Sequence, residues 1–114
     1  MSTVTTHVLD TALGRPAARV PVRFERLSPG PPTVLAEAVT DDDGRVRDLG
    51  PDDLCAGTYR LTFDTAAYAA ATGQANFFPE VAITFLLVQH DGAIPHHHVP
   101  LLLSPFSYSS YKGS

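Results

Sequence analysis

Three consecutive histidines, His96 to His98, are the strongest chemical signal in the sequence. In a strand, His96 and His98 point to one face, whereas His97 points to the other. Two imidazoles one pleat apart can bind a metal ion, or can hold a substrate and move protons near neutral pH. The leucines at 101–103 indicate an ordered segment rather than an accidental histidine run in a loop.

A further histidine, His7, lies in a segment whose alternation predicts a strand, and it faces away from Val4 and Val8. On its own, a partly exposed strand histidine is the simplest interpretation, and a functional role needs partners. Together with His96 and His98, His7 would supply three ligands for a zinc ion. The sequence beside the histidine run offers no obvious cysteine or carboxylate to complete such a site.

Arg45 and Arg47 follow an Asp43-Gly44 turn and share one face of the chain. Guanidinium groups are suited to polarising a carbonyl or recognising a planar anion. Surface arginines are common, so these two mean little without the histidines.

The C-terminal residues 106–114 are rich in aromatic and hydroxyl side chains, which is unusual for a frayed tail. We expect an ordered last strand there, with a terminal carboxylate placed near other functional groups. The final Gly-Ser is also compatible with a cloning remnant.

The elements that must position these residues are predicted to be short strands. The 10 prolines and 8 glycines fall between short apolar runs. Residues alternate between apolar and polar in 19–25 and 58–63, and 81–88 is apolar on both faces, as in a strand packed on two sides or in a subunit interface. The remaining strands are expected at about 3–10, 33–39, 96–103 and 106–112.

One short helix is expected over Ala66–Ala71, capped by Asp64 or Thr65 and ended by Gly73. Roughly eight strands with a single helix favour an all-β antiparallel sandwich. No repeat or long linker divides the chain, so we expect one domain over residues 1–114.

Composition excludes several classes of protein. The 114 residues are 44% hydrophobic, which suits one globular domain. Their net charge of −4 does not suit a protein that binds nucleic acid through a basic surface. No window contains the ~18–20 apolar residues that a membrane span needs. Cys55 is the single cysteine, so an internal disulfide is impossible and a reducing compartment is expected. The N-terminal residues show no export signal, and we expect a cytoplasmic location.

Four ordered motifs resemble those of the transthyretin-like family. Thr6–Ala17 resembles its N-terminal signature, and Phe77–Glu80 and His98–Pro105 resemble two further landmarks. Tyr111–Ser114 resembles the terminal Tyr-Arg-Gly-Ser of the enzyme branch, 5-hydroxyisourate hydrolase, which also argues against a cloning remnant. The likeness extends over residues 3–114. Lysine at position 112 keeps the charge of the family's arginine but lacks its bidentate fork.

The resemblance implies a sandwich of two four-stranded sheets with one short helix. It also implies a homotetramer whose subunits pair through edge strands, with active sites at the dimer–dimer interface. The implied activity is hydrolysis of a cyclic amide C–N bond: 5-hydroxyisourate is converted to 2-oxo-4-hydroxy-4-carboxy-5-ureidoimidazoline in urate degradation. Neither a cofactor nor a metal ion is implied.

The family's functional residues match individual positions. The resemblance implies that the catalytic residues are His7, Arg45 and His98, and that the substrate is bound by His7, Arg45, His96, Tyr111 and Ser114. Two alternatives stay open. One is a carrier of a small aromatic ligand without turnover, as in the hormone-binding branch, which lacks the histidines and the terminal tetrapeptide. The other is the zinc hydrolase described above.

Overall fold

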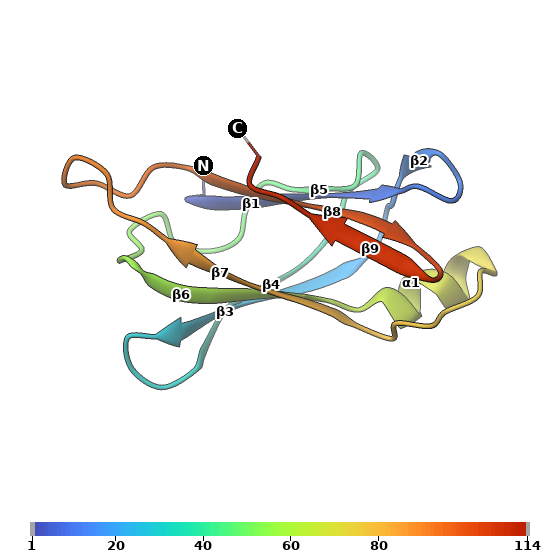
Figure 1. Cartoon of the computed structure of the whole chain (residues 1–114), viewed down its shortest axis with the longest axis horizontal. Coiled ribbons are helices and arrows are strands. Elements are labelled where there is room, and N and C mark those ends of the chain that lie inside the picture. Colours follow the sequence, from blue (N-terminus) through green and yellow to red (C-terminus); the bar gives the residue numbers. More distant parts are fainter. Residues whose placement is uncertain (1, 114) are drawn as a thin grey trace.

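Short alternating segments form strands throughout the chain (Figure 1). The structure is a computed structural model that describes residues 2–113. Its elements, in chain order, are β1 (Val4–Asp10), β2 (Arg15–Pro16), β3 (Pro21–Ser28), β4 (Thr33–Val39), β5 (Arg45–Val46), β6 (Gly57–Phe63), α1 (Thr65–Thr72), β7 (Val81–Leu87), β8 (His97–Ser104) and β9 (Ser107–Ser110).

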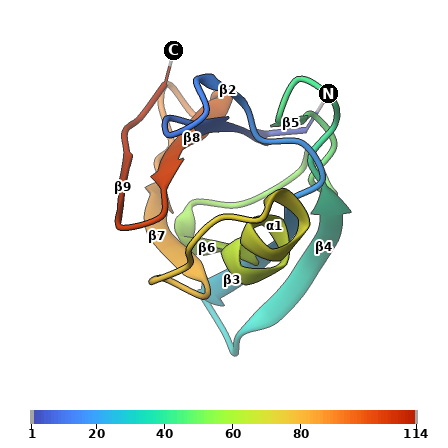
Figure 2. The same ribbon diagram turned by 90° about the vertical axis from the view of Figure 1, so that its right-hand side faces the viewer.

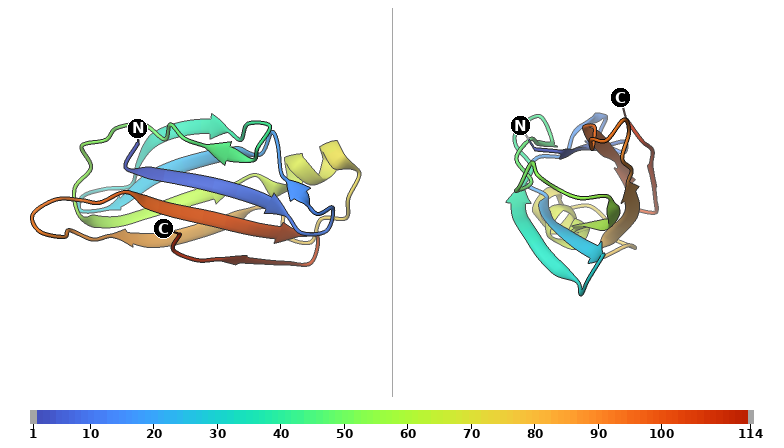
Figure 3. Two further views of the ribbon diagram at one scale, coloured as in Figure 1. Left: turned by 90° about the horizontal axis from the view of Figure 1, so that it is seen from above. Right: turned by 90° about the vertical axis from the view of Figure 1, so that its left-hand side faces the viewer.

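The strands form two sheets that face each other. One sheet has the order β2-β1-β8-β9, with β5 also paired to β1, and the other has the order β4-β3-β6-β7. The two-residue strands β2 and β5 lie along the same edge of β1, so this sheet has five strands in four positions. The transthyretin-like sandwich is therefore confirmed, with one short strand more than expected. Figure 3 shows β5, β1, β8 and β9 side by side.

The prediction of a purely antiparallel sandwich is wrong for one pair, because β1 and β8 run parallel. Parallel neighbours need a long crossover connection, and here the whole second sheet lies between them in the sequence. Local alternation carries no information about such a pairing. It is nevertheless this pair that places His98 beside the N-terminal strand, with His98 opposite Thr5.

The core lies between the two sheets. Its largest side chains come from inward-facing strand positions that alternate with exposed ones. Phe24 stacks on Tyr59 with ring centroids 5.6 Å apart. Val8 and Leu101 come from the other sheet and belong to the same buried cluster. Burial of this apolar surface is the main stabilising contribution to the fold.

Helix α1 closes one end of the sandwich (Figure 2). The Asp64 side chain accepts a hydrogen bond from the Ala67 amide, and Gly73 ends the helix with a φ of 66°, so both predicted boundaries are confirmed. The Tyr68 hydroxyl donates to Asp10 Oδ2 at 2.6 Å, which fastens the helix to the end of β1.

Two predicted strands differ from those observed. Arg19 has a φ of 65° and lies before β3, which begins at Pro21. β7 is an edge strand, and its outer face is not covered within residues 2–113, since Leu86 is 62% exposed; its burial in a subunit interface stays a prediction. β9 is at one edge of the other sheet, and β7 and β9 lie on the same side of the molecule (Figure 2). Within residues 2–113, no helix is long and apolar enough to cross a membrane.

Candidate active site

The outer face of one sheet gathers most of the residues that the sequence singled out. His7 on β1 is the direct cross-strand partner of Arg45 on β5, and Thr5 on β1 is the partner of His98 on β8. Residues two apart share a face of a strand, so the side chains of Thr5 and His7 point the same way. Strands β5, β1 and β8 thus bring one arginine and two histidines together from three distant parts of the chain.

A hollow of about 220 Å³ opens on this face. It is lined by Thr5, Thr6, Arg45, Val46, Arg47, His96 and His98. A guanidinium and two imidazoles in one hollow can bind a planar, carbonyl-rich molecule and exchange protons with it.

The His7 side chain is held by a backbone carbonyl. Its Nε2 lies 2.8 Å from the Asp43 carbonyl oxygen, which can only accept, so Nε2 carries the hydrogen. When the ring is neutral, Nδ1 is therefore free to accept a proton. Partial burial and the charge of Arg45 lower the pKa of His7, although the Asp43 carbonyl opposes them.

The turn before β5 fixes the position of Arg45. Asp41 Oδ1 accepts hydrogen bonds from the amides of Asp43 and Arg45, each at 2.9 Å. Gly44 has a φ of 75°, and a Cβ there would overlap the Val8 carbonyl oxygen. A residue without a side chain is therefore required for this turn to lie against β1.

His96 and His98 share one hydrogen-bonding partner. Thr5 Oγ1 lies 2.8 Å from His96 Nε2 and 2.8 Å from His98 Nδ1. Partial burial lowers the pKa of His98, and the charge of Arg45 and the nearby imidazoles of His7 and His96, which would repel a second positive charge, lower it further. The imidazole of His98 is therefore neutral at neutral pH, as a general base must be.

His97 points to the other side of the sheet, as its position in the strand predicted. It is 4% exposed, and its Nδ1 lies 2.7 Å from the Pro95 carbonyl oxygen. This ring belongs to the interior of the sandwich and not to the hollow.

The C-terminal tail approaches the site through Gly113. Its amide donates to the His98 carbonyl at 2.7 Å, and a Cβ on Gly113 would lie 2.6 Å from His98 Cδ2. Tyr111 is not brought to this hollow within one subunit: it is 59% exposed and lines a separate hollow of about 370 Å³ with Phe85 and Lys112. Ser114 lies outside the described residues.

Thr5 contacts two histidines of this hollow, but the sequence did not single it out. Threonine is common in strands, and its hydroxyl gains significance only from the register that sets it opposite His98. Its position two residues before His7, on the same face, was the available signal.

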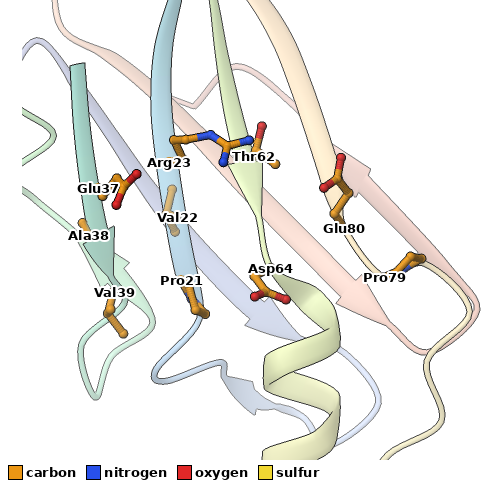
Figure 4. A pocket seen from close by; sticks show the side chains of 10 residues that line it. All are labelled: Pro21, Val22, Arg23, Glu37, Ala38, Val39, Thr62, Asp64, Pro79 and Glu80. Carbon is orange, nitrogen blue, oxygen red and sulfur yellow. The ribbon is translucent and has the colours of Figure 1, made fainter. Parts of the chain in front are cut away.

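A larger hollow of about 530 Å³ lies on the outer face of the other sheet (Figure 4). It is lined by Pro21, Val22, Arg23, Glu37, Ala38, Val39, Thr62, Asp64, Pro79 and Glu80. The titratable side chains there are carboxylates and an arginine, without a histidine, and Arg23 lies 3.5 Å from Glu25. This hollow does not have the groups for proton transfer near neutral pH.

No three side chains of His, Cys, Asp or Glu within 2–113 are arranged to hold a metal ion. The geometry therefore does not favour the zinc alternative built on His7, His96 and His98.

Comparison with known proteins adds independent evidence. The model of the HIUase/Transthyretin family matches residues 4–113. The 5-hydroxyisourate hydrolase of Caulobacter vibrioides is 44% identical over 118 residues, which cover 100% of both chains. The solved structure of Klebsiella pneumoniae 5-hydroxyisourate hydrolase matches with a TM-score of 0.83 and 37% identity, covering 100% of this chain and 94% of that one. Sea bream transthyretin in complex with thyroxine matches with a TM-score of 0.87 and 32% identity, covering 97% and 94%.

Proposed function

The chain belongs to the HIUase/Transthyretin family, and we propose that it hydrolyses 5-hydroxyisourate at the hollow lined by Arg45, His96 and His98. The product is 2-oxo-4-hydroxy-4-carboxy-5-ureidoimidazoline, so the chain acts in urate degradation. The single observation that carries the proposal is the meeting of two neutral imidazoles and a guanidinium on the outer face of β1, β5 and β8.

The reaction needs a base, a group that stabilises negative charge and a proton for the departing nitrogen. Water attacks a ring carbonyl, its proton passes to an imidazole, and the carbonyl oxygen becomes an oxyanion. When the C–N bond breaks, the protonated imidazole returns the proton to the nitrogen. His98, next to His96, and His7 activate the water and shuttle protons, and Arg45 binds the carbonyl and stabilises the oxyanion.

Tyr111 and Ser114 are proposed to hold the substrate from the C-terminal tail. Tyr111 would hydrogen-bond the planar ring, and the hydroxyl of Ser114 would orient water or a histidine. Tyr111 lines a neighbouring hollow in the single subunit, so its contact with substrate depends on the assembled protein.

The assembly is proposed to be a homotetramer with active sites at the dimer–dimer interface. Support comes from the edge strands β7 and β9, each of which has a neighbour on only one side within residues 2–113. Open edges of this kind pair readily with a second copy. Leu86 on β7 and Tyr108 on β9 have exposed side chains that a second copy would cover on pairing. Light scattering on the purified protein measures the number of subunits.

A carrier of a small aromatic ligand is the second candidate, and the likeness to thyroxine-bound sea bream transthyretin favours it. A carrier needs shape complementarity but not neutral imidazoles beside a guanidinium. We therefore rank hydrolysis first. We also propose a cytoplasmic location, since the single Cys55 is exposed as a free thiol, which suits a reducing compartment.

The test generates 5-hydroxyisourate in situ with urate oxidase and follows its ultraviolet decay with and without the protein. Accelerated decay that a chelator does not change supports the metal-free hydrolase. Acceleration lost with chelator would favour the zinc alternative, and tight thyroxine binding without acceleration would favour the carrier.

A further inference from the structure

The Thr5 hydroxyl is shared between two imidazoles of the proposed active site. It lies 2.8 Å from His96 Nε2 and 2.8 Å from His98 Nδ1, and the Thr5 residue is only 8% exposed. A hydroxyl has a single hydrogen, so it donates to one of these nitrogens and accepts from the other. The protons on His96 and His98 are therefore not independent.

Two arrangements satisfy the hydroxyl when both rings are neutral. In the first, His98 Nδ1–H donates to Thr5, and Thr5 donates to His96 Nε2, whose ring carries its hydrogen on Nδ1. In the second, His96 Nε2–H donates to Thr5, Thr5 donates to His98 Nδ1, and His98 carries its hydrogen on Nε2. Only the first leaves Nε2 of His98 free to take a proton.

The ring of His98 is held from two sides. Thr5 contacts Nδ1, and Gly113 lies against Cδ2 on the opposite side of Cγ. The Gly113 amide also donates to the His98 carbonyl at 2.7 Å. Nε2, at the far end of the ring, is therefore the atom of His98 that can contact a molecule in the hollow, which Arg45 also lines.

We propose that Thr5 is a positioning residue that keeps Nε2 of His98 unprotonated and passes a proton between His98 and His96 during hydrolysis. This inference rests on the proposed function. As the water O–H bond breaks and its oxygen bonds to the carbonyl carbon, the proton goes to His98 Nε2. His98 Nδ1–H moves to Thr5 Oγ1, and the Thr5 hydrogen moves to His96 Nε2. The reverse transfers return the proton to the departing nitrogen.

The charged groups around His98 support this role because they keep its ring neutral. His7 on β1, Arg45 on β5 and His96 before β8 lower the pKa of His98 together with burial. Arg47 lines the same hollow. The carboxylates of Asp41 and Asp43 raise the pKa of His7 instead. A neutral ring carries one hydrogen, and when that hydrogen lies on Nδ1 of His98 the Thr5 hydroxyl accepts it and donates to His96.

The test compares three substitutions. Thr5→Val removes the hydroxyl at nearly constant volume, and Thr5→Ser keeps it. Thr3→Val is the matched control, because Thr3 is also 8% exposed and its hydroxyl donates to the Asp52 carbonyl at 3.1 Å, away from the histidines. Thr5→Ala removes the same hydroxyl and replaces Thr5→Val if that variant fails to fold.

Two measurements are made on each variant. Long-range ¹H–¹⁵N NMR of histidine-labelled, ligand-free protein reports the tautomer of His98. We expect Nδ1–H in the wild type, Thr5→Ser and Thr3→Val, and a shift towards Nε2–H in Thr5→Val. The decay assay should show kcat lowered ~10–100-fold in Thr5→Val with KM little changed, because a catalytic group that loses its alignment loses up to about 10²-fold in rate. Thr5→Ser should stay within about threefold of the wild type, since it keeps the hydroxyl.

An Nε2–H tautomer of His98 in the wild type would overturn the inference. So would an unchanged tautomer and unchanged kcat in a folded Thr5→Val protein. A wild type that shows the expected tautomer but no hydrolysis would instead overturn the proposed function, because the NMR measurement does not depend on activity.

Discussion

His7 and Arg45 face each other directly across β1 and β5. The pairing places a permanent positive charge beside an imidazole and disfavours its protonation. The same guanidinium also lowers the pKa of His98 on the other side of β1. One arginine therefore has two expected effects, on the bound carbonyl and on the protonation of both histidines.

Arg45→Ala should lower kcat/KM by ~10²–10³-fold, because it removes the group that stabilises the oxyanion. Arg45→Lys keeps the positive charge but lacks the two parallel N–H donors of the guanidinium, so its kcat/KM should be only partly restored. The decay assay measures both, and circular dichroism checks the fold. Activity of folded Arg45→Ala equal to that of the wild type would remove Arg45 from the mechanism.

His7 and His98 should titrate below the ordinary histidine value of about 6.5. Because the base acts when neutral, activity should be constant above this value and fall only as the pH drops through the lowered pKa values of His7 and His98. In Arg45→Gln, both pKa values should rise, since a nearby positive charge is removed. NMR titration of the histidine Cε1 protons measures them. In the control Arg47→Gln, the pKa values of His7 and His98 should match those of the wild type. Equal pKa values in the Arg45→Gln and Arg47→Gln variants would contradict the role given to Arg45.

Gly44→Ala should lower both stability and activity. The new Cβ would overlap the Val8 carbonyl oxygen at a φ of 75°, so the turn must move away from β1 and take Arg45 with it. Gly14 is the matched control, because its φ is 70° and a Cβ there would have no atom within 4 Å. Thermal unfolding should show a loss of about 1 kcal/mol for Gly14→Ala, from backbone strain alone, and a larger loss for Gly44→Ala. Equal losses would mean that the contact with Val8 is relieved without strain.

Gly113→Ala should damage activity more than stability. Its Cβ would lie 2.6 Å from His98 Cδ2 and would displace the ring, while terminal residues contribute little to folding. The control Gly92→Ala, where a Cβ would have no neighbour within 4 Å, should keep full activity. A sharp fall in the melting temperature of Gly113→Ala, with turnover per folded molecule unchanged, would contradict this prediction.

Asp10 should stabilise the fold without acting in catalysis. Burial would raise its pKa, but hydrogen bonds from Tyr68, Leu13, Gln74 and Ala12 outweigh burial and hold the pKa below its ordinary value. Its contribution to stability is therefore complete above the unfolded-state pKa of about 3.9 and is lost as the pH falls through the lower folded value.

Tyr68→Phe should lower the free energy of unfolding by about 1.5–3 kcal/mol at pH 7, since it removes a hydrogen bond to a charged group. The difference from the wild type should shrink once Asp10 is protonated. Denaturant unfolding at several pH values measures this difference, and one that stays constant into acid would contradict the account of Asp10.

Strand alternation was sufficient to predict much of this molecule. It correctly placed His96 and His98 on the face opposite to His97, and the capping residues Asp64 and Gly73 marked the helix. These features depend on neighbouring residues, whose geometry the strand and helix periods determine. The antiparallel assumption failed at β1 and β8 because pairing between distant strands is decided by packing of the whole sandwich.

Only part of the candidate site could be predicted from the sequence. The family resemblance singled out His7, Arg45 and His98, and the sheet brings them to one face. Thr5 could not be selected, because an ordinary strand threonine becomes notable only when the register sets it between two imidazoles. The role of Tyr111 remains a prediction, since this residue lines a separate hollow in the chain.

The rate of 5-hydroxyisourate decay with the His98→Ala variant tests the central claim most directly. After the spontaneous rate is subtracted, we expect the catalysed decay to be ~10²–10⁴-fold slower than with the wild type at equal concentrations of folded protein, because a general base has been removed. His90→Ala is the matched control, since the side chain of His90 is 80% exposed in a loop, and it should keep the wild-type rate. Near-normal decay with a well-folded His98→Ala protein would contradict the account.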